Sequence, residues 1–375
     1  MATVLGAVIS VAGTAGADPQ DKHDYIVVFK DSVNDPGAAA ADQAKGGQAD
    51  VHFVYTSALK GYAATMTEAR AAAIARDPRV DSVVADTPVT ADSTQTAATW
   101  GLDRVDQRAL PLSTTFNYTA SGAGVTAYVI DTGINVAHSE FGTRASHGTD
   151  KIDGSLPAAD CNGHGTHVAG TIGGATYGVA KSVKLVAVRV LDCQGSGSTS
   201  GVIAGVDWVT ANAVKPAVAN MSLGGGTNSA LDTAVSNSIA SGITYGLAAG
   251  NGNIIGIAQD ACTTSPARVA SGITVGASDK TDKKASFSNY GNCVDLFAPG
   301  VSIVSAWYSS NTATNTISGT SMATPHVVGA AALYLSTAPT ATPAAVRTYL
   351  YDATTKGIVT AAKTSNNHLL FTNNL

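Results

Sequence analysis

Three short segments, far apart in the chain, carry an acid, a base and a nucleophile. Asp131 stands in Val-Ile-Asp-Thr-Gly, His164 in Asn-Gly-His-Gly-Thr-His, and Ser321 in Gly-Thr-Ser-Met-Ala-Thr-Pro. A serine hydroxyl is a weak nucleophile at neutral pH, so it needs an imidazole to accept its proton and a carboxylate to orient that imidazole. The segments therefore predict hydrolysis with Ser321 as nucleophile, His164 as general base and then acid, and Asp131 as the orienting group.

The chain around these residues alternates short apolar runs with segments of helical spacing. Because parallel strands buried on both faces read as continuous apolar runs, the alternation predicts an α/β fold with a mostly parallel sheet covered by helices on both faces. Functional groups of such a sheet gather at the carboxyl ends of its strands. Strands are expected at 125–130, 185–190, 218–223, 243–249 and 273–275, and helices at 200–213, 231–241 and 322–335.

The chain order Asp, His, Ser separates this sequence from other serine hydrolases. The α/β-hydrolases run Ser, acid, His and the chymotrypsin type runs His, Asp, Ser, whereas subtilisin has the order found here. From about Tyr25 to its end the chain resembles the subtilases, above all the proteinase K branch and, within it, aqualysin-like enzymes. Besides the triad motifs, the resemblance rests on the cysteine spacing and on Trp100–Arg108, Ala219–Gly225 and Ser286–Gly291. It implies a subtilisin-like three-layer catalytic domain preceded by a small α+β propeptide domain.

The N-terminal part of the chain has a different character. Residues 1–17 form a short apolar stretch that ends in Ala-Gly-Ala, which indicates a signal peptide although basic residues are missing at its start. The resemblance assigns 24–92 to a propeptide that acts as intramolecular chaperone and inhibitor, and 93–375 to the catalytic domain, with maturation near Asp92/Ser93. An N-terminal domain of another kind is the alternative. Within 24–92, strands are expected at 25–29 and 80–84 and a helix at 67–76.

Asn251 is the expected oxyanion donor. It follows the apolar run Ala-Ala-Gly, so its side-chain N–H can project from the end of a buried strand, with the Ser321 backbone N–H as partner. An Asn that only caps a turn is the alternative. The following loop, 252–261, is longer than the family pattern.

Peptide substrates bind protease clefts as extended strands. The resemblance implies that two short edges and the wall of a pocket bind the substrate, and the small side chains of this wall predict a broad preference for bulky apolar or aromatic residues before the scissile bond. No acidic residue in these motifs would select a basic side chain. The residues are Gly195, Ser196 and Gly197 on one edge, Ser222, Leu223 and Gly224 on the other, and Ala248, Ala249 and Gly250 in the wall.

The sequence holds 4 cysteines. In an exported chain they favour disulfides over metal or redox roles, and the residues alone leave three pairings open. The resemblance implies the pairs Cys161–Cys193 and Cys262–Cys293. Where some relatives carry a free thiol beside the catalytic histidine, this chain has Val168.

The resemblance also implies structural Ca²⁺ and no catalytic cofactor. Asp103, Asp106, Gln107 and Ser113 bring together the oxygen ligands that calcium prefers. A second family site matches Asp295, with the main-chain carbonyls of Ala270 and Gly272. Solvated surface acids are the alternative at both places. Zinc catalysis is disfavoured, because the His164–His167 segment lacks the His-Glu-x-x-His pattern.

The composition limits which kinds of partner the protein is expected to bind. Charged residues make up 13% of the chain and the net charge is -5, so no basic surface is expected for nucleic acid, and no apolar run is long enough for a membrane span. Together with these limits, the resemblance implies a secreted, extracellular, self-processing serine endopeptidase that acts on polypeptides, binds its own propeptide and is a monomer. The alternatives are a latent complex in which the propeptide stays bound, and an esterase that uses the same triad.

Overall fold

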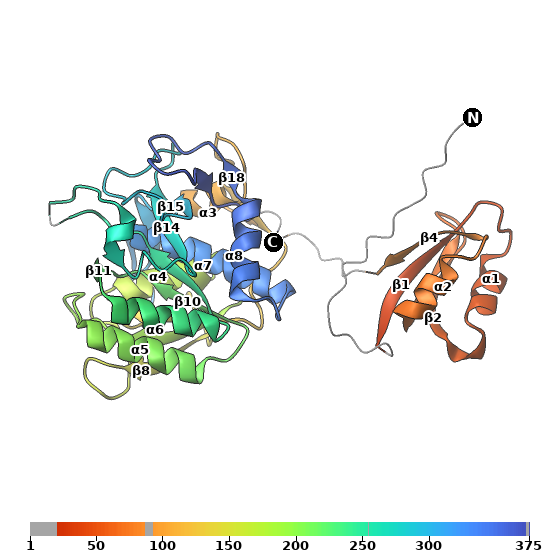
Figure 1. Ribbon diagram of the computed structural model, residues 1–375, viewed down its shortest axis with the longest axis horizontal. Helices are drawn as coiled ribbons and strands as arrows, with labels where there is room; N and C mark the ends of the chain where they lie inside the picture. Colours follow the sequence, from red (N-terminus) through yellow and green to blue (C-terminus); the bar gives the residue numbers. More distant parts are fainter. Residues whose placement is uncertain (1–20, 87–92, 254, 373–374) are drawn as a thin grey trace. The chain divides into compact units, whose positions relative to one another are not determined.

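A computed structural model describes residues 21–86, 93–253, 255–372 and 375 (Figure 1). They divide into two compact units, 21–86 and 93–375, each with its own core. The expected signal peptide, 1–17, and Asp92 of the expected maturation site lie outside the described residues. Within the described ranges, no helix combines the length and apolar character needed to cross a bilayer.

The first unit is a four-stranded antiparallel sheet of order β2-β3-β1-β4 with helices packed against it. The strands expected at 25–29 and 80–84 are present within β1 and β4, and the helix expected at 67–76 is present as the shorter α2. Val27, Tyr62 and Met66 form its fully buried core with Ile74 of α2. The elements are β1 (Lys22–Phe29), α1 (Pro36–Gln43), β2 (Ala49–Tyr55), β3 (Gly61–Thr67), α2 (Glu68–Ile74) and β4 (Val80–Ala85).

The second unit is built on a nine-stranded sheet of order β18-β19-β15-β14-β12-β10-β7-β9-β8, in which all pairings except β18–β19 are parallel. The expected mostly parallel sheet is confirmed. Its strands are β7 (Thr126–Asp131), β8 (Ala145–Asp150), β9 (Lys184–Arg189), β10 (Ala217–Met221), β12 (Thr244–Ala248), β14 (Ile273–Ser278), β15 (Leu296–Pro299), β18 (Thr355–Lys356) and β19 (His368–Leu369).

Helices cover both faces of this sheet, and the central strand β7 shows why. Ala127 and Val129 point to the core beneath α4, α7 and α8, while Tyr128 and Ile130 point to the core beneath α5 and α6. A strand buried on both faces must be apolar throughout, which explains the continuous run before Asp131. The helices are α3 (Trp100–Val105), α4 (His164–Gly173), α5 (Thr199–Asn212), α6 (Ser229–Ala240), α7 (Thr320–Thr337) and α8 (Pro343–Ala353).

Short two-stranded ribbons complete the unit. One of them, β5 with β6, begins at Ser93 and so lies at the start of the expected catalytic domain. The ribbon strands are β5 (Ser93–Thr96), β6 (Thr115–Tyr118), β11 (Gly225–Gly226), β13 (Thr264–Ser265), β16 (Ile303–Ala306) and β17 (Thr314–Ile317).

Candidate active site

Three neighbouring strands bring the predicted polar residues to one edge of the sheet. In the sheet β10 lies between β7 and β12, and all three run parallel. Asp131 is the last residue of β7, Ser222 follows β10, and Asn251 lies three residues beyond β12. The carboxyl ends of parallel strands share an edge, so the topology itself gathers side chains that are distant in sequence.

The Asp131 carboxylate holds the His164 imidazole. His164 Nδ1 lies 2.8 Å from Asp131 Oδ1 and 3.0 Å from Oδ2. Asp131 is fully buried, whereas the His164 side chain remains 24% exposed. This geometry fixes the ring so that Nε2 is the nitrogen left to exchange a proton. Burial opposes the charged imidazolium, but the Asp131 charge and hydrogen bond prevail, with help from Asp160, and raise the pKa of His164 above its ordinary value.

Two other histidines, one within and one directly after the catalytic motifs, are structural. His167 is fully buried one turn into α4, with Nε2 bonded to Ile303 O at 3.0 Å. His326 in α7 is buried with Nδ1 bonded to Met322 O at 2.9 Å. Burial lowers the pKa of each to about 4, so both stay neutral at neutral pH. His164 alone of the three pairs with a carboxylate and reaches the surface.

Asp160 anchors the loop that leads into His164. Its Oδ1 accepts hydrogen bonds from Thr132 Oγ1 at 2.9 Å, Asn162 N at 2.9 Å and Gly163 N at 2.8 Å. Its Oδ2 accepts from Thr166 N at 2.9 Å and Thr166 Oγ1 at 2.6 Å. The carboxylate thereby satisfies N–H groups at the start of α4 and ties them to the end of β7. Asp160 was not predicted from the sequence, although an Asp close to the start of a helix is a capping signal.

Ser321 is the second residue of α7 and is 9% exposed. Its Oγ donates to Ser222 O at 3.1 Å, and Ser222 Oγ donates to Ser321 O at 2.8 Å. The nucleophile candidate is thus fixed to the segment that follows β10. Among the described residues no hydrogen bond joins Ser321 Oγ to His164, and such contacts often close only when substrate is bound.

The Asn251 side chain is oriented by the residue before Ser321. Asn251 Oδ1 accepts from Thr320 N at 2.8 Å and from Thr320 Oγ1 at 2.9 Å. With its oxygen engaged, the carboxamide presents Nδ2 as a donor beside the start of α7, where the Ser321 N–H is also placed. This is the geometry that an oxyanion site requires of its donors.

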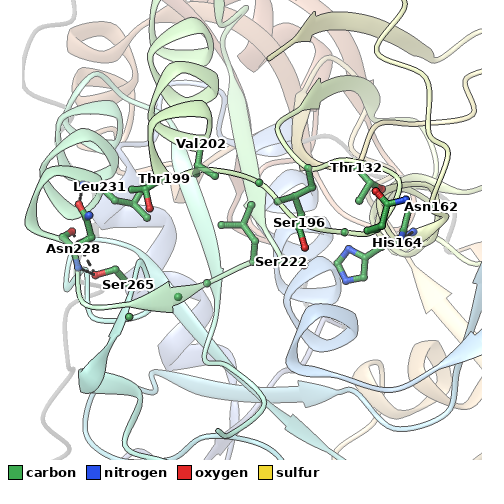
Figure 2. A pocket seen from close by; sticks show the side chains of 18 of the residues that line it. Thr132, Asn162, His164, Ser196, Thr199, Val202, Ser222, Asn228, Leu231 and Ser265 are labelled. Atoms are coloured by element: carbon green, nitrogen blue, oxygen red, sulfur yellow. Dashed lines mark hydrogen bonds between the residues drawn. The ribbon is translucent and has the colours of Figure 1, made fainter. Parts of the chain in front are cut away.

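A cavity of about 650 Å³ opens beside His164 (Figure 2). Figure 2 shows Ser196 and Ser222 on segments that face one another, with His164 and Thr132 toward one end and Asn228 and Ser265 toward the other. All six predicted edge residues line the cavity: Gly195, Ser196, Gly197, Ser222, Leu223 and Gly224. The predicted wall residues Ala248, Ala249 and Gly250 do not line it, and the two alanines are buried at the end of β12.

All four cysteines are paired, as Cys161–Cys193 and Cys262–Cys293. The first bridge ties the segment just before His164 to the segment just before Gly195, and Asn162 Nδ2 adds a hydrogen bond to Cys193 O at 3.0 Å. The second bridge closes the region that follows the loop after Asn251.

The predicted calcium residues of the first cluster lie in and after α3. The Asp103 carboxylate accepts from Ser113 N, Ser113 Oγ and Thr114 N. Asp106 Oδ2 accepts from Asn117 N and Nδ2, while Asp106 Oδ1 is buried without a hydrogen-bond partner. A buried carboxylate oxygen without a partner is costly unless a cation or water satisfies it, so these residues fit a bound calcium.

Two further observations bear on calcium. In the described part of the chain, no three His, Cys, Asp or Glu side chains converge on one point, so a cation at Asp106 would also need amide, hydroxyl or main-chain oxygens such as those of Gln107 and Ser113. Asp295 is differently engaged: Oδ2 accepts from Thr274 N at 2.8 Å and Oδ1 pairs with Arg347. Arg347 already compensates the charge of Asp295, whereas the Asp103 carboxylate accepts only from neutral donors, so the Asp295 arrangement favours an ion pair over a calcium ion held with the Ala270 and Gly272 carbonyls.

Comparison with known proteins identifies the family of both units of the chain. Residues 122–370 match the subtilase family, peptidase S8, and residues 24–92 match the peptidase inhibitor I9 family. An extracellular serine proteinase of a Thermus species is 61% identical over 325 residues, which are 86% of this chain and 78% of that protein.

Two further relatives show the same likeness. The alkaline serine exoprotease A of Vibrio alginolyticus is 54% identical over 86% of this chain, which spans only 60% of that longer protein. The crystal structure of a cold-adapted subtilisin-like serine proteinase superposes with a TM-score of 0.71 at 57% identity, covering 74% of this chain and 99% of that one.

Proposed function

The chain belongs to the subtilase family and is a subtilisin-like serine peptidase, and we propose that Asp131, His164 and Ser321 carry out its reaction. The strongest support is that His164, hydrogen-bonded to Asp131, lines the cavity. Ser222 lines the same cavity, and its carbonyl oxygen accepts a hydrogen bond from the Ser321 hydroxyl, which ties Ser321 to this place.

In the proposed reaction, Ser321 Oγ attacks the scissile carbonyl carbon while His164 Nε2 accepts the hydroxyl proton. The negative charge of Asp131 stabilises the imidazolium that results. Asn251 Nδ2 and the Ser321 N–H donate to the oxyanion of the tetrahedral intermediate. His164 then returns the proton to the leaving amine. A water molecule, which His164 deprotonates in the same way, attacks the acyl-enzyme and releases the acyl group from Ser321.

The substrate runs as an extended strand along the cavity. The backbone of Gly195–Gly197 and of Ser222–Gly224 would pair with it from opposite sides. None of the residues that line the cavity is acidic, and Leu191, Val202 and Leu231 add apolar surface. A broad preference for bulky apolar or aromatic side chains before the scissile bond follows. Fastest cleavage of chromogenic peptides that end in Arg, rather than in Phe or Leu, would contradict it.

Residues 24–92 act as the propeptide. Their match to the peptidase inhibitor I9 family supports an inhibitor that also assists folding and is removed near Asp92/Ser93. We infer that the precursor is exported and works outside the cell as a monomer, with 1–17 as the signal peptide. Two disulfides fit an oxidising compartment, and the Thermus relative is itself named extracellular.

A structural calcium ion would be held by Asp106 with Asp103, Gln107 and Ser113. It would satisfy the buried Asp106 Oδ1 and stabilise the turn after α3, and it takes no part in the chemistry. The half-life of activity at elevated temperature should therefore fall when a chelator is added, and the Asp106→Ala variant should no longer respond to it. A wild-type half-life that the chelator leaves unaltered would remove calcium from this proposal.

The proposed function is tested by comparing the precursor with its Ser321→Ala variant. The wild-type precursor should lose its N-terminal segment and hydrolyse peptides, whereas the variant should keep its full mass and hydrolyse none. A variant that still processes itself in the absence of other proteases would show that Ser321 is not the nucleophile.

A further inference from the structure

The segment Ser286–Gly291 is one of the family motifs, yet no step of the reaction above uses it. Within it the Asn289 side chain is only 1% exposed, so its polar atoms must find partners inside the protein. These partners turn out to surround Asn251, which lies far from Asn289 in sequence.

Asn289 bonds to the residues on both sides of Asn251. Asn289 Nδ2 donates to Ala249 O at 2.9 Å, and Asn289 N donates to Gly250 O at 2.9 Å. Asn289 Oδ1 accepts from Gly252 N at 3.0 Å and from Gln259 N at 2.8 Å. One buried residue thus holds the backbone just before and just after the oxyanion donor.

The backbone at Gly250 is tightly packed against Asn289. Gly250 has a φ of +99°, and a Cβ placed on it would lie 2.5 Å from Asn289 Nδ2, so the chain passes directly against the amide. On the other side, Gly250 N donates to Thr320 Oγ1 at 3.1 Å, the same hydroxyl that binds Asn251 Oδ1. The Asn251 main chain is therefore held between the start of α7 and Asn289.

We propose that Asn289 is a positioning residue for the oxyanion site, which sets the place of Asn251 and so the aim of its Nδ2 donor. The proposal rests on the proposed function, in which Asn251 donates to the oxyanion. Thr320 fixes the orientation of the Asn251 carboxamide, and Asn289 fixes the main chain from which that carboxamide projects.

This arrangement also explains how the long loop after Asn251 is tolerated. Asn289 Oδ1 binds both Gly252 N and Gln259 N, so it closes the base of the loop. The loop has its own bonds above that base, with Asn253 N donating to Ile257 O and Asn253 Oδ1 accepting from Ile255 N and Ile257 N. Ile255 is 73% exposed. A conformational change at the tip of the loop is therefore not expected to pass its base or to displace Asn251.

The test is a double-mutant cycle of kcat and KM with Asn251→Ala, Asn289→Ala and the double variant, normalised to folded, processed protein. A displacement near 1 Å of a catalytic group can cost up to about 10²-fold in rate, so Asn289→Ala should lower kcat by about 10- to 100-fold with KM nearly unchanged. In the Asn251→Ala background the same substitution should change kcat by less than about threefold, because the group it positions is gone.

Asn367→Ala is the matched control. Asn367 also clamps a loop, with Oδ1 accepting from Val359 N at 2.9 Å and Nδ2 donating to Val359 O at 2.8 Å. It directly precedes β19, which β15 and β14 separate from β12 in the sheet. It should lower stability to urea without lowering kcat. Ile255→Ser, at the exposed loop tip, should also leave kcat unchanged. If Asn289→Ala does not fold, Asn289→Asp takes its place in the cycle, since it keeps the size and the acceptor and exchanges the donor to Ala249 O for a carboxylate oxygen.

The outcomes separate the two proposals. If Asn251→Ala leaves kcat unaltered, the assignment of the oxyanion donor in the proposed function is wrong. If Asn251→Ala lowers kcat but the substitution at Asn289 lowers it by the same factor in both backgrounds, or by no more than Asn367→Ala does, the positioning role of Asn289 is overturned and the oxyanion assignment stands.

Discussion

Substituting Asp160 by Asn tests how the fold sets the chemistry of His164. The Asp160 carboxylate accepts five hydrogen bonds and is 9% exposed. A carboxamide of the same shape can still accept from Thr132 Oγ1, Asn162 N and Gly163 N with its oxygen. Its NH₂ group must then face Thr166 N, a buried donor that loses its partner. An unsatisfied buried donor costs about 1 to 3 kcal/mol, so the free energy of unfolding should fall by that amount.

The same substitution should change the pH dependence of catalysis. The negative charge of Asp160 contributes to the raised pKa of His164, although the Asp131 carboxylate contributes more. Removing the charge lowers this pKa, so neutral imidazole persists to lower pH. The acid limb of kcat/KM, which reports the general base of the free enzyme, should therefore move to lower pH. The assay is kcat/KM against pH on one chromogenic peptide, with urea unfolding measured on the same preparations.

Asp279→Asn is the matched control for this prediction. Asp279 Oδ1 accepts from Thr281 N, Thr281 Oγ1 and Lys283 N in a loop outside the active site. An Asn at this place can keep the three hydrogen bonds with its oxygen and loses only the charge, so the acid limb should stay where it was. The reasoning about Asp160 is refuted if its acid limb stays in place or moves to higher pH while the protein remains folded.

Three further predictions concern the triad, a disulfide and a buried ion pair. Asp131→Asn should lower kcat by roughly 10⁴-fold, because the imidazole loses its orienting charge. Pre-steady-state assays should place this loss in the acylation step, and a loss of kcat below tenfold would contradict the assignment of Asp131. Replacing both cysteines of Cys161–Cys193, which are 32 residues apart, by Ser should lower the free energy of unfolding by about 3 to 4 kcal/mol in urea titration, and an unchanged midpoint would argue against it. Arg104 is fully buried and its Nε binds Asp282 Oδ1 at 2.6 Å, so Asp282→Ala should cost about 3 to 5 kcal/mol; a Tm equal to that of the wild type would show that the pair is dispensable.

The main architecture could be predicted from the sequence because periodicity reports burial directly. The apolar runs at 125–130 and 218–223 correspond to β7 and β10 within a residue or two, and the helices at 200–213 and 231–241 correspond to α5 and α6. Strands buried on both faces have no polar positions to obscure this signal.

Helix α4, which carries His164, could not be predicted in this way. Gly165, Gly170 and Gly173 lie within it, and each glycine lowers intrinsic helix propensity by about 1 kcal/mol. The structure shows why they are there: a Cβ at Gly165 would collide with Gly133 O, and one at Gly170 with Ser305 Oγ. Close packing of this helix against the end of β7 and against β16 overrides propensity, and only the tertiary structure shows that packing.

The candidate site was predictable to the level of motifs and no further. Motif order supplied Asp131, His164, Asn251 and Ser321, but the hydrogen bonds of Asp160 and Asn289 connect segments that no local pattern relates. The same holds for calcium: sequence could group Asp103 with Asp106, yet only the structure shows that Asp295 is paired with Arg347.

The most direct test of the catalytic account is to treat the mature enzyme with a serine-directed phosphonylating reagent and to locate the label by peptide mass spectrometry. The account predicts one label per molecule, on Ser321, with activity lost in proportion to labelling, and no label after His164→Ala. Label on another residue, or peptide hydrolysis that continues when Ser321 is fully modified, would contradict it.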